Sequence, residues 1–227
     1  MKKLVKRMLS TGNDIVSLNA VNKTRTKQFV FYSKILSHTE KELFDKSEFK
    51  SIPFENFVWL LWSIKESAYK YLQRITPDIL FSPTKITVNN VQIPVGYNLN
   101  TIDITQTEGI GFNNMMVLNG SATYGSTTLY SSSILSSELI LSVVNHKENF
   151  ENVGWGVKLI DKNDPDYQSA AVRAFLVKKL NTLFRTDDLV ILKTPDGIPI
   201  VMKKNVELPI PVSLSHHDRL IAYSYTQ

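Results

Sequence analysis

Apolar residues between positions 54 and 74 recur at helical spacing. They are Phe57, Leu61, Ile64, Ala68 and Leu72, separated by four, three, four and four positions. This period places them on one stripe of an α-helix, and Pro53 directly before the segment is typical of a helix start. Glu66 and Lys70 lie off the stripe and one turn apart, so the predicted helix carries them together on a second face.

Two further segments favour helix. Residues 167–184 are rich in helix-forming residues, and residues 26–44 contain a potential capping box at Thr39 and Glu42. We therefore predict a helix in each segment.

Short runs of β-branched and aromatic residues, separated by Gly, Asn and Ser, predict strands through much of the remaining chain. They occupy residues 13–18, 85–88, 115–118, 122–129, 139–144, 155–160, 189–192, 198–202, 211–215 and 220–225. The serine-rich residues 131–137 are interpreted as a turn. Residues 161–166, which include a proline, suggest a domain boundary. The prediction is an α+β fold with two similar lobes, residues 1–160 and residues 161–227.

Composition narrows the possible functions. The 227 residues contain no cysteine, which excludes disulfide scaffolds, thiol catalysis and zinc sites with cysteine ligands. No run of about 18 apolar residues occurs, so we expect no membrane span and a cytoplasmic protein.

The net charge is +5, and residues 1–80 carry 14 basic and 8 acidic side chains. Such a basic segment attracts phosphates or an acidic protein partner, although a solvated basic surface has the same composition.

Three short motifs point to a specific chemistry. They are Gly12-Asn13-Asp14, the segment Trp62-Ser63-Ile64-Lys65-Glu66-Ser67-Ala68-Tyr69-Lys70, and Gly197-Ile198-Pro199 followed by Ser213-Leu214-Ser215-His216. Together they resemble the 4'-phosphopantetheinyl transferase superfamily. That family has a Gly-x-Asp strand, a helix with Trp-Ser-x-Lys-Glu-x-x-x-Lys, and a Gly-x-Pro turn that leads to a Ser-His strand.

The resemblance implies transfer of phosphopantetheine from coenzyme A to a serine of an acyl- or peptidyl-carrier protein. It implies that Asp14 and Glu66 bind Mg²⁺, a hard cation that one or two carboxylates hold beside substrate phosphates. Glu66 also becomes a candidate base, and Lys70 a candidate to stabilise the diphosphate or the leaving group. Without the motifs, a turn-capping Asp14 and an ordinary Glu66–Lys70 ion pair would be the simpler interpretation.

The same resemblance suggests residues that bind coenzyme A. His216 corresponds to a histidine that contacts the 3'-phosphate, and Ser215 beside it offers a neutral donor. Lys65, Arg173 and Lys193 are further candidates for phosphate contacts.

The chain also departs from the family pattern. Val16 stands where the larger, surfactin-synthetase-activating type has a third acidic ligand, and Ile198 stands where those enzymes often have lysine. The order of the motifs is that of the smaller holo-acyl-carrier-protein synthases, which form trimers. A monomeric pseudo-dimer of the two lobes is favoured, and a trimer of a small-type domain with an insertion is the alternative.

Two other functions compete with the transferase. Val16 and Ile198 fit a non-catalytic protein that binds coenzyme A or a carrier protein. The basic first third fits nucleic-acid binding, but its aromatic residues follow helical core spacing and are not interleaved with basic residues. We therefore expect coenzyme A and a carrier protein as partners, and neither nucleic acid nor a membrane.

Overall fold

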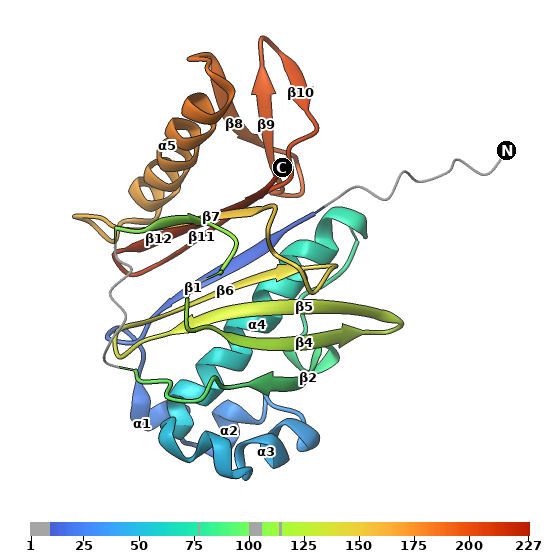
Figure 1. The fold of residues 1–227 in the computed structure, drawn as a ribbon, viewed down its shortest axis with the longest axis vertical. Coiled ribbons are helices and arrows are strands. Elements are labelled where there is room, and N and C mark those ends of the chain that lie inside the picture. The colour runs from blue at the N-terminus through green and yellow to red at the C-terminus, as the bar shows by residue number, and fades with distance from the viewer. Residues whose placement is uncertain (1–9, 77, 100–105, 114) are drawn as a thin grey trace, which may run out of the picture.

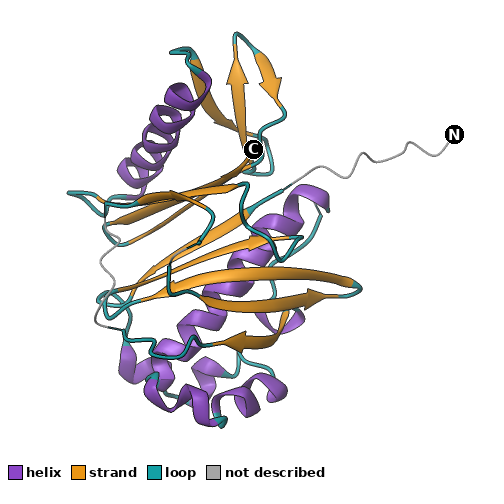
Figure 2. Cartoon of the chain, viewed as in Figure 1, coloured by secondary structure: helices purple, strands orange, loops and turns teal. Residues whose placement is uncertain are grey.

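The computed structural model describes residues 10–76, 78–99, 106–113 and 115–227. Within these ranges the chain is a mixed α+β protein with three antiparallel sheets (Figures 1 and 2), which confirms the predicted fold class. Among the described helices, none is both long enough and apolar enough to cross a bilayer.

The largest sheet, sheet A, has five strands. In spatial order they are β1 (Gly12–Ser17), β6 (Leu139–Asn145), β5 (Thr127–Leu135), β4 (Leu118–Tyr124) and β2 (Thr87–Gln92). Helix α4 (Phe54–Ile75) packs against this sheet (Figure 1). All five residues of its apolar stripe are at most 2% exposed, so the predicted helix and its core face are confirmed.

Helix α5 (Pro165–Phe184) and one smaller sheet lie at the other end of the molecule, and a second smaller sheet lies between them and sheet A (Figure 1). Sheet B consists of β11 (Val212–His217), β12 (Leu220–Thr226), β7 (Val153–Leu159) and β3 (Glu108–Ile110), and sheet C of β10 (Val206–Leu208), β9 (Pro199–Lys203) and β8 (Leu189–Lys193). Strand β7 precedes the predicted domain boundary but pairs with β12 beyond it. The division after residue 160 stays a prediction.

Four local predictions are wrong. Residues 115–117 do not belong to a strand, and residues 122–129 include the turn between β4 and β5. Residues 26–44 do not form one helix but parts of three short ones: α1 (Lys23–Thr26), α2 (Phe29–Tyr32) and α3 (His38–Phe44). Extended backbone at Gln28 and Ser37 separates them, and the capping box is formed by Ser37 with Glu40. The serines at 131–133 belong to β5, where the Ser133 and Ser142 hydroxyls form a hydrogen bond across the sheet. Two short 3₁₀ helices, η1 (Ser47–Ser51) and η2 (Pro83–Lys85), flank α4 in the chain.

Strand β1 connects sheet A to sheet B through buried polar side chains. The hydroxyl of Thr11, directly before β1, lies 2.8 Å from that of Ser224. The backbone N–H of Asn13 donates to Ser213 Oγ at 3.0 Å. On its other side β1 approaches α4 so closely that a Cβ on Gly12 would lie 1.9 Å from the carbonyl oxygen of Ser67. Only glycine at this position therefore allows β1 to pass this close to the backbone of α4.

Candidate active site

Asp14 and Glu66 meet around the ammonium group of Lys70. Lys70 Nζ lies 3.2 Å from Asp14 Oδ1 and 3.2 Å from Glu66 Oε1, and it donates to the carbonyl oxygen of Asn13 at 3.0 Å. Because both carboxylates contact the same nitrogen atom, Asp14 Oδ1 and Glu66 Oε1 are no farther apart than twice 3.2 Å. The fold therefore brings together the carboxylate pair that the motifs predicted, one member from β1 and one from α4.

The Asp14 carboxylate occupies an unfavourable environment for a negative charge. Burial, reinforced by the nearby Glu66, raises the pKa of Asp14 to about 7, although Lys70 opposes this shift. Burial also acts to lower the pKa of Lys70, but the two carboxylates outweigh it and the pKa is raised. The other Asp14 oxygen, Oδ2, is buried and has no hydrogen-bond partner among the described residues. A cation bound to that oxygen would stabilise the ionised carboxylate.

The donor set at this position fits a magnesium ion shared with a substrate. Among the described residues no group of three or more His, Cys, Asp or Glu side chains could hold a metal ion. Val16 is buried at 2% exposure and supplies no third acidic ligand. Two carboxylates alone match Mg²⁺, which commonly completes its octahedral shell with water and substrate phosphates.

A pocket of about 230 Å³ adjoins the carboxylate pair, and Lys70, Lys193 and His216 all line it. Its walls come from α4, α5, β8, β11 and the turn before β9. The Arg74 guanidinium donates hydrogen bonds to the carbonyl oxygens of Pro199 and Val212 and so ties α4 to β9 and β11. The pocket thus presents two ammonium groups and an imidazole next to the two carboxylates, an arrangement suited to a polyphosphate.

Residues 10–108 match the family model of the 4'-phosphopantetheinyl transferase superfamily. This match confirms the resemblance over the segment that contains Asp14, Glu66 and Lys70, and it supports phosphopantetheine transfer as the general activity. Lys193 and His216 lie outside the matched segment. The comparisons with curated proteins and with solved structures found no match.

The histidine expected to contact coenzyme A lies at the edge of this phosphopantetheinyl-transferase-like site. Burial, followed by the charges of Lys70 and Lys193, lowers the pKa of His216 and favours a neutral imidazole. His217 is not free in solvent. Its Nδ1 accepts a hydrogen bond from the Ser17 amide at 2.8 Å, and its ring stacks on Trp59.

Ser215, predicted to bind coenzyme A, faces β1 in the structure. It is 3% exposed, and its Oγ accepts a hydrogen bond from Asn13 Nδ2 at 2.7 Å. Its hydroxyl therefore helps to hold β11 against β1, which aligns His216 with Asp14.

Lys65 requires a correction. Its side chain is fully buried, and its Nζ contacts Glu40 Oε2 at 2.7 Å and the carbonyl oxygen of Ile35 at 2.6 Å. The expectation that Lys65 contacts phosphate does not fit this position, because its ammonium group is enclosed in the core and already paired. The lysine of the motif has a structural role here.

Arg173 lies half-buried on α5 but does not line the pocket, although Ser169 and Val172 on the same helix do. Its contact with coenzyme A stays a prediction. Sequence reasoning missed Arg74 and Asn13. Arg74 stands one helical turn beyond Lys70, a spacing that indicates a shared face, whereas nothing in the local sequence indicates the partners of Asn13 on β11.

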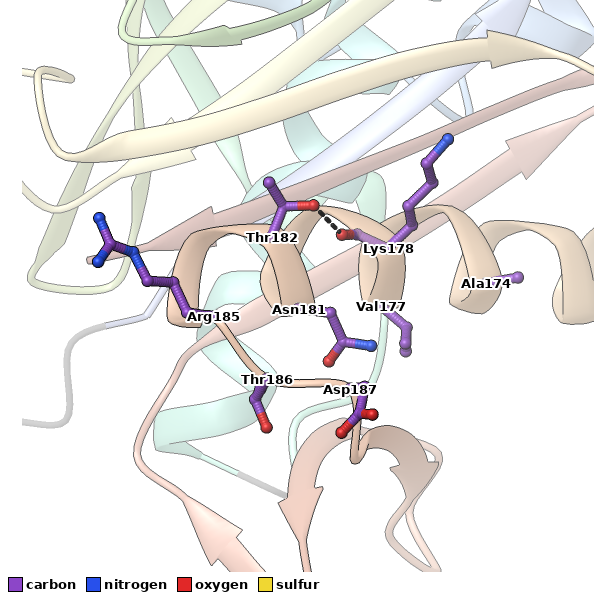
Figure 3. A pocket seen from close by; sticks show the side chains of 8 residues that line it. All are labelled: Ala174, Val177, Lys178, Asn181, Thr182, Arg185, Thr186 and Asp187. Carbon is purple, nitrogen blue, oxygen red and sulfur yellow. Dashed lines mark hydrogen bonds between the residues drawn. The ribbon is translucent and has the colours of Figure 1, made fainter.

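A larger hollow of about 770 Å³ runs along the end of α5 and the loop that follows it. Figure 3 shows its side chains, which come only from residues 174–187. The hollow includes one carboxylate, that of Asp187, and none of the predicted site residues. It therefore lacks the paired acids that define the candidate active site.

Proposed function

We propose that the protein is a Mg²⁺-dependent 4'-phosphopantetheinyl transferase that uses coenzyme A and modifies a serine of an acyl- or peptidyl-carrier protein. The observation that carries this proposal is the Asp14–Lys70–Glu66 cluster at the mouth of a pocket lined by Lys193 and His216. Such a site combines the acidic ligands and the cations that diphosphate chemistry needs.

In the proposed reaction the serine oxygen forms a bond to the β-phosphorus of coenzyme A. The bond between this phosphorus and the bridging oxygen breaks, and 3',5'-ADP leaves. Glu66 takes the serine proton, directly or through water. Lys70 and Lys193 hold phosphate oxygens, and His216 donates to the 3'-phosphate. Bound Mg²⁺ would neutralise charge on the diphosphate.

The residues of this site come from both predicted lobes. Asp14 and Glu66 precede residue 160, whereas Lys193 and His216 follow it. We therefore propose that the chain is a pseudo-dimer with its site between the lobes, and that it functions as a monomer. Light scattering coupled to size-exclusion chromatography tests this, and a trimer would favour the alternative of a small-type domain with an insertion.

The surface of α1 and α2 offers a docking site for an acidic carrier protein. Phe29 and Val30 on α2 are 65% and 64% exposed, and the Lys41 ammonium lies 5.0 Å from the centre of the Phe29 ring. Lys23 and Arg25 on α1 add positive charge. An apolar tip among basic side chains complements an acidic helix with an apolar face.

Mass spectrometry of an apo carrier protein tests the function directly. With coenzyme A and Mg²⁺ the carrier should gain the mass of phosphopantetheine, and the gain should disappear with Glu66→Ala. Glu42→Ala, which changes an exposed acid on α3, is the matched control and should retain transfer. Coenzyme A binding without mass gain on any carrier offered would favour the non-catalytic alternative.

A further inference from the structure

The Lys70 ammonium group lies between the two acids that are the candidate metal ligands. It is surrounded by Asp14 Oδ1, Glu66 Oε1 and the carbonyl oxygen of Asn13, at 3.2, 3.2 and 3.0 Å. Carboxylate and carbonyl oxygens are also the ligands that hard divalent cations prefer. The same three groups can therefore satisfy either an ammonium group or a metal ion.

We infer that Lys70 is the resident cation of this site in the metal-free protein, and that a divalent cation binds only by displacing it. The inference rests on the proposed function, because it treats Asp14 and Glu66 as metal ligands. It goes beyond that function by assigning Lys70 a role before any substrate binds.

The charges at the site explain why a resident cation is needed. Asp14 is 4% exposed and lies close to a second carboxylate, so two like charges meet in a poorly solvated place. An uncompensated charge there would be strongly destabilising. One ammonium group compensates only part of this charge, and within the part of the chain that the structure describes the buried Asp14 Oδ2 has no hydrogen-bond partner. The cluster is therefore stable without metal but still attracts a divalent cation.

The pocket beside the cluster can accept the Lys70 ammonium group when a metal ion displaces it. The Lys70 side chain is 22% exposed and lines the pocket that contains Lys193 and His216. A diphosphate in that pocket would accept the released ammonium group. Metal and diphosphate should consequently strengthen each other's binding, because the phosphate oxygens replace the carboxylate partners that Lys70 loses when the metal binds.

Metal binding without coenzyme A provides the first test. Mn²⁺ is titrated into the full-length protein, and free Mn²⁺ is followed by electron paramagnetic resonance. If Lys70 occupies the site about nine-tenths of the time, Lys70→Met should bind Mn²⁺ about tenfold more tightly than the wild type. The control is Lys179→Met on α5, which removes the same charge from an ion pair with Glu108 on β3. This variant should bind Mn²⁺ with unchanged affinity. Equal or weaker binding by Lys70→Met would overturn the inference.

A second test needs no variant and so does not depend on the folding of Lys70→Met. The wild-type protein is acetylated briefly with and without excess Mg²⁺, and each lysine is quantified by mass spectrometry. Displacement predicts faster acetylation of Lys70 in Mg²⁺ relative to Lys179, which serves as the internal reference. An unchanged ratio contradicts displacement.

Neither experiment contains coenzyme A or a carrier protein, so their outcome is separate from that of the transfer assay. Displacement without transfer would leave the metal site and remove the proposed reaction. Transfer without displacement would remove only the assigned role of Lys70.

Discussion

Lys65 and Lys70 lie five residues apart on α4 and both pair with carboxylates, but their surroundings differ. Lys65 and Glu40 are both fully buried, and the two oxygens of Glu40 also accept the amide N–H groups of Ser37 and Val88. Lys70 is partly exposed and faces two acids, and one oxygen of Asp14 has no hydrogen-bond partner in the described ranges. The first cluster is closed and complete, whereas the second has a spare acid and an opening to a pocket.

Within one sequence motif, the Lys65 cluster therefore stabilises the fold, and the Lys70 cluster is the candidate ligand site. A completed, buried ion pair has no capacity for a ligand, and it fixes α4 relative to α3 and β2. An incomplete cluster keeps an unsatisfied oxygen and a movable cation, which are what a metal and a phosphate require. The two clusters should therefore respond differently to substitution.

The largest expected effect on stability is at the closed cluster. Lys65→Ala leaves the Glu40 carboxylate buried without its cation, which should lower the free energy of unfolding by about 3–5 kcal/mol. Urea denaturation followed by circular dichroism measures this loss. A loss below about 1 kcal/mol, the range of exposed ion pairs, would show that the pair is not buried in solution.

The open cluster should show the reverse pattern. Glu66→Gln keeps the shape of a partly exposed side chain, so unfolding should change by less than about 1 kcal/mol. Phosphopantetheine transfer should fall at least about 100-fold, because a metal ligand and the candidate base are lost together. Parallel denaturation and transfer assays measure both. A variant that is much less stable but fully active per folded molecule would make Glu66 structural.

The third cation on α4, Arg74, should have an intermediate effect. Arg74→Ala removes donors to two backbone carbonyl oxygens and should lower the free energy of unfolding by about 1.5–3 kcal/mol. Since these bonds position the walls of the pocket, the KM for coenzyme A should rise more than kcat falls. Arg74→Lys should recover part of the affinity, and an unchanged KM in both variants would separate Arg74 from the pocket.

The last prediction is a pH dependence of stability that originates in the open cluster. The pKa of Asp14 rises from 3.8 to about 7 on folding, so the native state retains a proton that the unfolded state has lost. In metal-free buffer this contribution should reduce stability as pH increases from about 4 to about 7, and Asp14→Asn should abolish it. Denaturation midpoints of both proteins across that range measure the difference, and parallel curves would contradict the prediction.

The sequence predicted what depends on local pattern. The stripe on α4 and the β-branched runs of β6, β8 and β12 reflect periodicity and propensity. The motifs indicated Asp14, Glu66 and His216, whose roles stay predictions. The sequence did not predict the breaks within residues 26–44, because several candidate caps compete there and tertiary contacts of Glu40 select Ser37. Lys65 was misassigned for a related reason: its partner Glu40 is 25 positions away, and spacing on the helix alone cannot reveal an ion pair between distant segments.

We propose above that Asp14 and Glu66 hold a divalent cation against the diphosphate of coenzyme A. The most direct measurement is Mn²⁺ binding in the presence of coenzyme A, followed by paramagnetic resonance with detection of ³¹P hyperfine coupling. We expect one Mn²⁺ per wild-type chain with coupling to phosphorus, and loss of this species in both Asp14→Asn and Glu66→Gln. Wild-type binding and coupling in either variant would contradict it.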